Sequence, residues 1–270
     1  MDKLDPDNRL RLLLIFVAYH PSEEEVEHLA ACLASLPIHI GYAVVANDYL
    51  DREPVDRLAP AAKLFLPMES NLGYGRAVNR AVREWRRRFR LPAWISALNT
   101  DLSWAPGSFE DLLSWLELQD QVTLAVPRIV DPSGQPQQLC KLDPTLLGLL
   151  SRRFLPDALK PAWLRRYDSR YVMADRDLDT VFEVPYLSGC CMLIRTCSFL
   201  AVGGFDERYF LYLEDADLTR RLRTLGPTVH LPLASIVHAW GRGNHRSWRL
   251  TLVNLHSAWI YFSTWGLRFC

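Results

Sequence analysis

Short apolar segments alternate with amphipathic helical segments through the first half of the sequence. The apolar segments read as β-strands, and they span residues 12–18, 40–48, 63–66, 93–102 and 123–130. The intervening segments carry apolar side chains at helical spacing, over residues 22–36, 75–89 and 106–118. Such an alternation predicts an α/β fold whose mainly parallel central sheet is flanked by helices on both faces.

Local signals support individual elements of this pattern. Ser22 and Glu25 have the spacing of a capping box at the start of the first helix. In the helix over residues 75–89, the apolar residues are predicted to face the sheet and the arginines to face solvent; the apolar residues are Ala77, Val78, Ala81, Val82 and Trp85.

The second half is less regular. Residues 140–180 interleave apolar and arginine residues, and an apolar strand is expected over residues 186–195. The aromatic-rich residues 247–267 favour a long C-terminal helix.

Composition narrows the functional class. Lys plus Arg and Asp plus Glu both number 31, so net charge gives no support for general nucleic-acid binding. The six cysteines form no Cys-x-x-Cys pair, which favours a reduced, cytoplasmic chain. No run reaches about 18 uncharged apolar residues, so no transmembrane helix is expected, and residues 10–19 are interpreted as a strand rather than a targeting segment.

Polar residues follow several of the predicted strands. In parallel sheets, ligands collect at the carboxyl ends of the strands. The candidate ligand-binding residues are therefore those at or just beyond these ends: Tyr19-His20, Asn47-Asp48, Asn71 to Gly75, and Asn99 to Asp101.

The stretch FLYLEDADLTRRL, residues 210–222, concentrates three carboxylates at the start of a predicted helix. Asp215 in a cleft could serve as a general base, with Asp217 in a structural pair with Arg221. The alternative is that Glu214, Asp215 and Asp217 only favour the helix dipole.

Each of three further motifs leaves two interpretations open. Asp101, in Asn-Thr-Asp after a strand, could bind Mg²⁺ or Mn²⁺ or could cap a turn. The loop NLGYGRAVN could approach a phosphate through its glycines or be an ordinary turn. His238 could be a metal ligand or a hydrogen-bonded structural histidine.

Taken in order, NLGYGRAVNRAV, LNTDL, LSGCCMLIRTCSFLAVGGFDERYFLYLEDADLTRRLRTLG and ASIVHAWG resemble the family 2 glycosyltransferases of the GT-A fold. Within that family the sequence is most similar to the rhamnosyltransferase-like branch of bacterial surface polysaccharide synthesis. The resemblance covers about residues 10 to 265 and is most specific from Gly189 to Gly226. It implies a single GT-A domain over residues 1–270. A nucleotide-sugar-binding half would span residues 10–130, an acceptor and catalytic half residues 131–246, and a C-terminal helix residues 247–270.

The resemblance also implies site roles. Asp215 matches the catalytic base, Asp101 the metal-binding acid, and His238 a metal ligand of some members. The remaining matched or adjoining positions would bind the substrates: Ala18, Tyr19, Asn47, Asp48, Asn71, Gly73, Gly75, Asn79, Asn99, Gly189, Glu214 and Trp240. The sequence departs from the usual family pattern at His20, Ala46 and Asn99.

The implied activity is inverting, metal-dependent transfer of a sugar, rhamnose from dTDP-rhamnose, onto a saccharide or lipid-linked acceptor. The cofactor would be Mg²⁺ or Mn²⁺, and the chain could contact the inner face of the membrane peripherally or form a homodimer. Two other functions stay open at this point: a sugar nucleotidyltransferase, and a non-catalytic carbohydrate- or nucleotide-binding relative.

Overall fold

The computed structural model describes residues 10–239 and 248–270. Its strands are β1 (Leu12–Ala18), β2 (Ile40–Ala46), β3 (Leu64–Pro67), β4 (Trp94–Asn99), β5 (Leu102–Trp104), β6 (Leu124–Val130), β7 (Cys140–Lys141), β8 (Phe182–Glu183), β9 (Tyr186–Leu187), β10 (Cys191–Arg195) and β11 (Thr228–His238). Its α-helices are α1 (Glu23–Ala34), α2 (Tyr74–Arg88), α3 (Ser108–Glu117), α4 (Leu146–Phe154), α5 (Ala162–Tyr171), α6 (Thr196–Ala201), α7 (Glu214–Leu222) and α8 (Trp248–Trp265).

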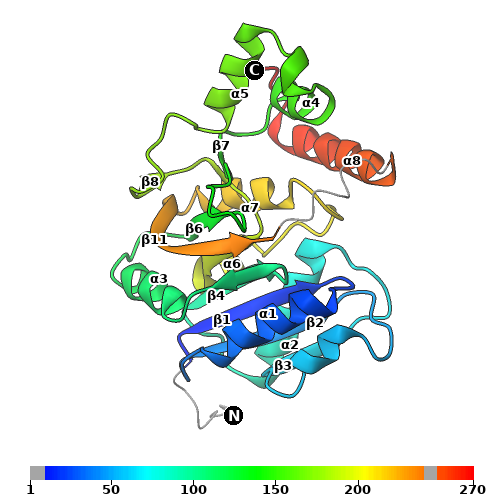
Figure 1. The fold of residues 1–270 in the computed structure, drawn as a ribbon, viewed down its shortest axis with the longest axis vertical. Coiled ribbons are helices and arrows are strands. Elements are labelled where there is room, and N and C mark those ends of the chain that lie inside the picture. The colour runs from blue at the N-terminus through cyan, green and yellow to red at the C-terminus, as the bar shows by residue number, and fades with distance from the viewer. Residues whose placement is uncertain (1–9, 240–247) are drawn as a thin grey trace.

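The described residues form one large mixed sheet covered by helices (Figure 1). Its strand order is β3-β2-β1-β4-β10-β6-β11-β5, and β8 pairs with β11. The pairs among β3, β2, β1 and β4 are parallel, as the alternating sequence pattern predicts. The strand β10 then runs antiparallel to both β4 and β6. The long connection from β6 to β10 contains α4 and α5 together with the short strands β7, β8 and β9.

Helix packing in the first half follows the sequence predictions. The five apolar residues of α2 named above are all buried, and the helix packs on β1, β2 and β3. Ser22 accepts a hydrogen bond from the Glu25 amide, which caps α1 as predicted. The residues of β1 from Leu12 to Phe16 are fully buried, as expected for a strand covered on both faces.

The strand predicted over residues 93–102 divides in two. It ends at Asn99, the chain bends at Thr100 and Asp101, and β5 begins at Leu102. Since β5 pairs with β11 and Leu102 lies opposite His238, the bend brings Asp101 beside the end of β11. The Ala239 amide also donates to the Asp101 carbonyl oxygen at 3.0 Å.

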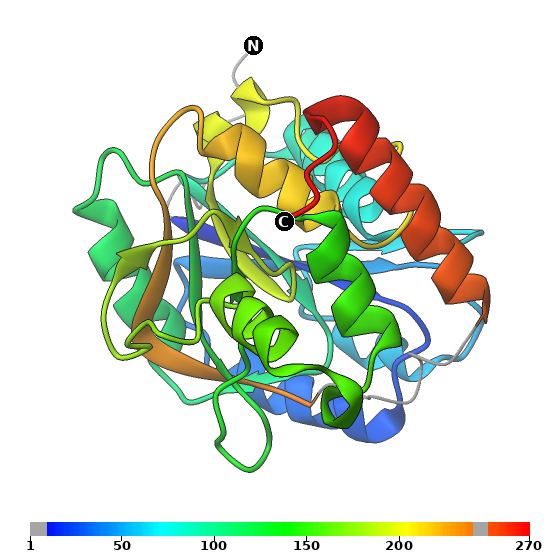
Figure 2. The same cartoon turned by 90° about the horizontal axis from the view of Figure 1, so that it is seen from above.

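Helices α4, α5 and α8 lie together at one end of the molecule (Figure 1), and Figure 2 looks down on that end. The helix α8 packs on α7 through a second hydrophobic cluster, which includes Leu213, Ala216, Ile260 and Tyr261. Ser257 of α8 donates to the Leu211 carbonyl oxygen at 2.7 Å. The C-terminal helix therefore supports the segment that leads into α7.

Candidate functional site

A cavity of about 1080 Å³ contains six of the residues predicted from the sequence. These residues come from β4 and its end, from the segment before β10, and from α7 and β11, and they are Asn99, Asp101, Gly189, Glu214, Asp215 and His238. The metal-site residue Asp101 and the candidate base Asp215 are far apart in sequence but line the same space.

Asp101 and His238 lie next to each other at one part of this cavity. Asp101 Oδ2 is 3.3 Å from His238 Nε2. The other ring nitrogen, Nδ1, is 3.1 Å from Gln137 Oε1, and Gln137 also donates to the His238 carbonyl oxygen. Gln137 therefore fixes the orientation of the imidazole with Nε2 toward the carboxylate.

The residues present fit a divalent cation that also binds substrate phosphates. Asp101 Oδ1 is buried and has no hydrogen-bond partner among the described residues, which is costly unless a ligand satisfies it. No group of three or more His, Cys, Asp or Glu residues capable of holding a metal occurs within residues 10–239 and 248–270. A site built from Asp101 and His238 thus matches Mg²⁺ or Mn²⁺, which commonly take few protein ligands and complete their coordination with water and substrate phosphates.

A strained turn leads into α7. Tyr212 and Leu213 both have positive φ, 71° and 63°, a conformation that non-glycine residues adopt at a cost. The helix begins immediately afterwards, with Glu214 and Asp215 in its first turn. The turn therefore directs both carboxylates into the cavity.

Backbone and tyrosine donors hold the Asp215 carboxylate. The Gly189 amide donates to Oδ2 and the Ala216 amide to Oδ1, both at 2.9 Å. The Tyr186 hydroxyl lies 3.2 Å and 3.3 Å from the two oxygens. A Cβ added at Gly189 would stand 3.1 Å from the Asp215 Cβ, so this position favours glycine.

Burial dominates the electrostatics of this pair of acids. It raises the pKa of Asp215, and the positive charge of Lys141 together with the hydrogen bonds from Gly189, Ala216 and Tyr186 opposes that rise. Burial, followed by the neighbouring Asp215 charge, raises the pKa of Glu214 to about 8. Below that pH, Glu214 is neutral and the two side chains together carry at most one charge.

Substitution of Glu214 tests this arrangement through the pH dependence of stability. The Glu214 pKa rises from an ordinary 4.5 to about 8 on folding, so the folded chain keeps a proton that the unfolded chain loses. Stability therefore falls as pH rises from about 4.5 to about 8. Glu214→Gln stays neutral throughout, so its stability relative to the parent should increase by on the order of 5 kcal/mol over this range.

Urea unfolding at several pH values measures this difference. Glu23→Gln, on the exposed first turn of α1, provides the control and should follow the parent. Parallel pH curves for Glu214→Gln and the parent would contradict the raised pKa.

The third acid of the motif has a structural role. Asp217 is buried and forms the predicted ion pair with Arg221 at 2.8 Å. Its Oδ1 accepts a hydrogen bond from Trp265 Nε1 of α8 at 2.9 Å. Asp217 therefore joins α7 to the C-terminal helix and does not line the cavity.

Several predicted substrate-binding residues lie at the carboxyl ends of β1 and β2 or at the start of α2, outside the lining of this cavity. Asn47 Nδ2 donates to Asn71 Oδ1 at 2.8 Å, and Asn47 Oδ1 accepts from the Leu72 amide at 2.8 Å. Tyr19 is exposed beside His20, whose ring contacts Glu53 and Asp48, and Ala18 is buried. These residues lie along the same sheet edge, because Ala18 pairs with Ala46, and Val17 with Asn99.

Asn79 and Gly75 make structural contacts. The Asn79 side chain donates to the Phe205 carbonyl oxygen at 2.8 Å and accepts from the Phe205 amide at 3.0 Å. A Cβ added at Gly75 would be 2.8 Å from the Phe205 Cβ, so this glycine allows α2 to approach Phe205. Trp240 lies outside the described residues.

Gly73 joins the start of α2 to the loop before α7. Its φ is 82°, and a Cβ there would stand 2.2 Å from the Phe210 carbonyl oxygen. Gly73→Ala should therefore destabilise the protein by on the order of 3 kcal/mol, through both backbone strain and the clash.

Gly107→Ala separates these two effects. Gly107 also has positive φ, 89°, but an added Cβ would meet nothing within 4 Å, so the expected loss is about 1 kcal/mol. Urea unfolding provides both values. Equal losses of unfolding free energy for the two variants would show that an added Cβ at residue 73 does not clash with the Phe210 carbonyl oxygen.

Sequence reasoning missed several cavity residues. They are Gln137, Lys141 and Tyr186. The Tyr74 hydroxyl donates to the Gly189 carbonyl oxygen at 2.8 Å, and Lys141 Nζ lies 4.8 Å from the centre of the Tyr186 ring. For Lys141 and Tyr186 the available signal was the basic and aromatic character of residues 140–190, which does not indicate which side chains point inward, and Gln137 carried no such signal.

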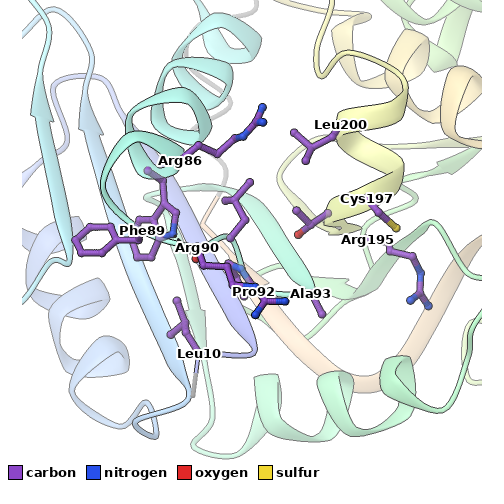
Figure 3. Close-up of a pocket in the computed structure, with 12 residues that line it drawn as sticks. Leu10, Arg86, Phe89, Arg90, Pro92, Ala93, Arg195, Cys197 and Leu200 are labelled. Atoms are coloured by element: carbon purple, nitrogen blue, oxygen red, sulfur yellow. Dashed lines mark hydrogen bonds between the residues drawn. The ribbon is translucent and has the colours of Figure 1, made fainter. Parts of the chain in front are cut away.

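A second cavity, of about 590 Å³, lies near the amino ends of β1 and β4 (Figure 3). Arg86 of α2 and Phe89, which follows that helix, approach it from one side, and Cys197 and Leu200 of α6 from the other. It contains no carboxylate and none of the predicted site residues. The candidate chemistry therefore belongs to the larger cavity.

The fold identifies the class of protein. The chain superposes on GalNAc-T7, solved with UDP, GalNAc and Mn²⁺, with a TM-score of 0.64 and 12% identity over 96% of this chain, and spans 48% of that solved chain. It also superposes on the mannosyltransferase PcManGT from Pyrobaculum calidifontis, solved with GDP-Man and Mn²⁺, with a TM-score of 0.58 and 15% identity, covering 91% of this chain and 61% of that one. These similarities establish the GT-A glycosyltransferase fold.

Sequence comparison then identifies the family. No family model matches the chain. It is 32% identical to the N-acetylglucosaminyl-diphospho-decaprenol L-rhamnosyltransferase of Mycobacterium tuberculosis, over 92% of this chain and 86% of that protein. A shorter match, 43% identical over 22% of each chain, is to rhamnosyltransferase WbbL of Escherichia coli strain K12. The chain belongs to the family 2 glycosyltransferases, in the rhamnosyltransferase-like branch. It is therefore a glycosyltransferase, and this decides against the nucleotidyltransferase and non-catalytic alternatives.

Proposed function

We propose that this glycosyltransferase moves a sugar from a nucleotide-diphosphate donor to an acceptor hydroxyl by a single, inverting displacement. The observation that most supports this proposal is that Asp101, with its unsatisfied carboxylate oxygen, and Asp215 line one cavity. Asp101 would suit the departing diphosphate through a bound metal ion, and Asp215 would suit the incoming alcohol as its base.

Asp101 and His238 would hold a divalent cation, with Asn99 beside them. A bound Mg²⁺ or Mn²⁺ would neutralise the charge that develops on the departing diphosphate. Two glycosyltransferases of the same fold were solved with Mn²⁺, which is consistent with this proposal.

Asp215 would act as the general base. Its ionised carboxylate accepts the proton of the acceptor hydroxyl while the hydroxyl oxygen forms a bond to the anomeric carbon. The bond from that carbon to the phosphate oxygen breaks, and the nucleoside diphosphate departs with the bonding electrons. Attack from the opposite face inverts the anomeric configuration, so no covalent intermediate on the chain is needed. The amides of Gly189 and Ala216 hold the carboxylate in place for this step.

The donor is proposed to be dTDP-rhamnose and the acceptor a lipid-linked saccharide in bacterial surface polysaccharide synthesis. Two relatives are named as rhamnosyltransferases, which supports rhamnose as the sugar. The name of the relative from Mycobacterium tuberculosis includes N-acetylglucosaminyl-diphospho-decaprenol, which supports a lipid-linked acceptor. The remaining residues predicted to bind the donor lie along the adjacent sheet edge, at Asn47, Asn71 and Gly73.

A transfer assay tests the function directly. The protein is incubated with dTDP-, UDP- and GDP-sugars, with Mg²⁺, Mn²⁺ or EDTA, and with N-acetylglucosaminyl diphosphate carrying a short prenyl chain. We expect the protein to transfer rhamnose from dTDP-rhamnose, and we expect EDTA to abolish the transfer. NMR of the product should show that the anomeric configuration is inverted. Absence of transfer from every donor, retention of configuration, or full activity in EDTA would overturn the corresponding part of the proposal.

The C-terminal end of the fold suits contact with an anionic membrane surface. None of the described helices is both long and apolar enough to span a bilayer. However, α4, α5, α8 and the connection between α4 and α5 expose large apolar side chains, among them Leu150, Phe154, Leu159, Trp163, Leu255 and Trp259. Exposed arginines accompany them on α5 and α8, including Arg165, Arg166 and Arg249. Apolar and cationic side chains together favour a surface of anionic lipid headgroups at the inner face of the membrane.

Removal of two exposed tryptophans tests this contact. Trp163 and Trp259 are 61% and 67% exposed, so a Trp163→Ser, Trp259→Ser variant should bind vesicles rich in phosphatidylglycerol about tenfold or more weakly. Vesicle co-sedimentation measures the binding.

An Ile38→Ser, Leu118→Ser variant is the control, because these exposed apolar residues come just before β2 and just after α3, elements that lie away from α4, α5 and α8 in Figure 1. The control should bind like the parent. If the tryptophan variant instead changes a dimer into a monomer with no change in vesicle binding, the surface is an interface between two copies.

A further inference from the structure

The larger cavity contains a second group of charged residues that the proposed chemistry does not use. Lys141 of β7 and Arg152 of α4 both line it. Lys141 Nζ lies over the Tyr186 ring, whose hydroxyl contacts Asp215. The Arg152 guanidinium carbon lies 5.9 Å from the centre of the Tyr171 ring. The cavity therefore has a cationic region in addition to the region with Asp101 and His238.

No carboxylate forms a salt bridge with this cationic region among the described residues, although the Asp215 charge acts on Lys141 from a greater distance. Neither Lys141 nor Arg152 forms a salt bridge within the part of the chain that the structure describes. Two other acids of this part of the fold are committed elsewhere, since Asp143 pairs with Arg223 and Arg268, and Asp168 with Lys160.

The two cations also disfavour each other. Burial lowers the pKa of Lys141, the Arg152 charge lowers it further, and Asp215 opposes the change. Arg152 is exposed and Lys141 is partly buried, so the repulsion between them falls mainly on Lys141 and would be relieved by an anion bound between the two. Such an arrangement is typical of an anion-binding site.

We infer that Lys141 and Arg152 bind the diphosphate of the acceptor, at a subsite separate from the donor diphosphate at Asp101 and His238. This inference rests on the proposed function and specifies how its acceptor is held. Arginine and lysine are the side chains best suited to phosphate oxygens.

The order of groups along the cavity agrees with the order of groups in a lipid-linked sugar. The acceptor hydroxyl must reach Asp215, and Lys141 lies close enough for its charge to act on that carboxylate. Arg152 follows on α4, and Leu149, three residues earlier on the same helix face, also lines the cavity. Sugar, diphosphate and lipid would thus lie in turn against Asp215, the two cations, and the apolar part of α4.

Two acceptors distinguish this subsite from the rest of the site. The first is N-acetylglucosaminyl diphosphate with a short prenyl chain, and the second is an octyl N-acetylglucosaminide without phosphate. The parent should prefer the first acceptor by its kcat/KM. Arg152→Gln should reduce that preference about 10- to 100-fold, the effect of losing one or two charge-assisted hydrogen bonds. Arg152→Lys should restore part of it.

Matched variants exclude a general effect of charge. Arg88→Gln removes an exposed arginine at the end of α2, outside the cavity and away from the proposed lipid-contacting surface, and should keep the parent's preference. Lys141→Gln should lower the preference as Arg152→Gln does, and it supplies the test if the Arg152 variants fail to fold.

Two outcomes would overturn the inference. An equal loss of kcat/KM with both acceptors would mean that the cations do not recognise the diphosphate. A rise in the donor KM, with the acceptor preference unchanged, would assign them to the donor diphosphate instead. Metal-dependent donor hydrolysis without acceptor provides a separate readout. If the parent neither hydrolyses nor transfers any donor sugar, the proposed function fails rather than the subsite.

Discussion

Asp215→Asn is expected to lower kcat for sugar transfer about a thousandfold while leaving the donor KM within a few-fold of the parent. The amide occupies nearly the same volume but cannot accept the proton of the acceptor hydroxyl, and general bases contribute factors of about 10² to 10⁴. Initial rates at saturating donor and acceptor measure the loss.

The pH profile gives a second readout of the same assignment. Transfer requires an ionised Asp215, and burial raises the pKa of this carboxyl. Activity of the parent should therefore fall as pH decreases through that raised pKa. The residual activity of Asp215→Asn should lack this acid limb. A variant with full activity, or with the parent's acid limb, would remove Asp215 from the role of base.

Asp217→Asn is the matched control, because Asp217 lies two residues along the same helix. It is buried against Arg221 and Trp265, so the variant leaves the Arg221 charge without its carboxylate. Its stability should fall by about 3 kcal/mol, and at a temperature where it remains folded its kcat should stay within a few-fold of the parent. The two aspartates would thus separate chemistry from stability.

Asp101→Asn is expected to lower transfer activity about 10²-fold or more and to weaken metal-dependent donor binding. The amide cannot supply the negative charge that Mg²⁺ or Mn²⁺ prefers. Thermal shift measurements with a nucleoside diphosphate, with and without Mn²⁺, report the binding because stabilisation follows affinity. The parent should gain stability only with both ligands present, and Asp101→Asn should lose most of that gain.

Asp120→Asn, at an exposed turn after α3, is the control and should behave like the parent. A Mn²⁺-dependent shift of the same size in Asp101→Asn would show that the cation is held elsewhere.

Local features of the sequence predicted much of the first half of the fold. The apolar residues of α2, from Ala77 to Trp85, are buried as the helical spacing predicts, and the Ser22 cap forms. The Asp217–Arg221 pair follows from the four-residue helical spacing. Each of these depends on neighbours in sequence, whose geometry the helix or strand period fixes.

Pairings between remote segments were beyond sequence reasoning. Nothing in residues 93–104 indicates that the strand divides at Asn99, since the bend depends on β5 pairing with β11. The same holds for Lys141, whose place beside Tyr186 depends on the two-residue pairing of β7 with β9. A short strand without a clear period does not specify which of its side chains points inward.

The sequence by itself thus determined the class of fold, the helix faces and the family, because these depend on local periodicity and on motifs in a fixed order. Tertiary structure alone decided which of the candidate residues share a cavity. Asp101 meets His238 through the β5–β11 register, and Asp215 enters the same space through the turn at Tyr212 and Leu213. Contacts between distant segments are set by the packing of the whole chain, so no local pattern of residues encodes them.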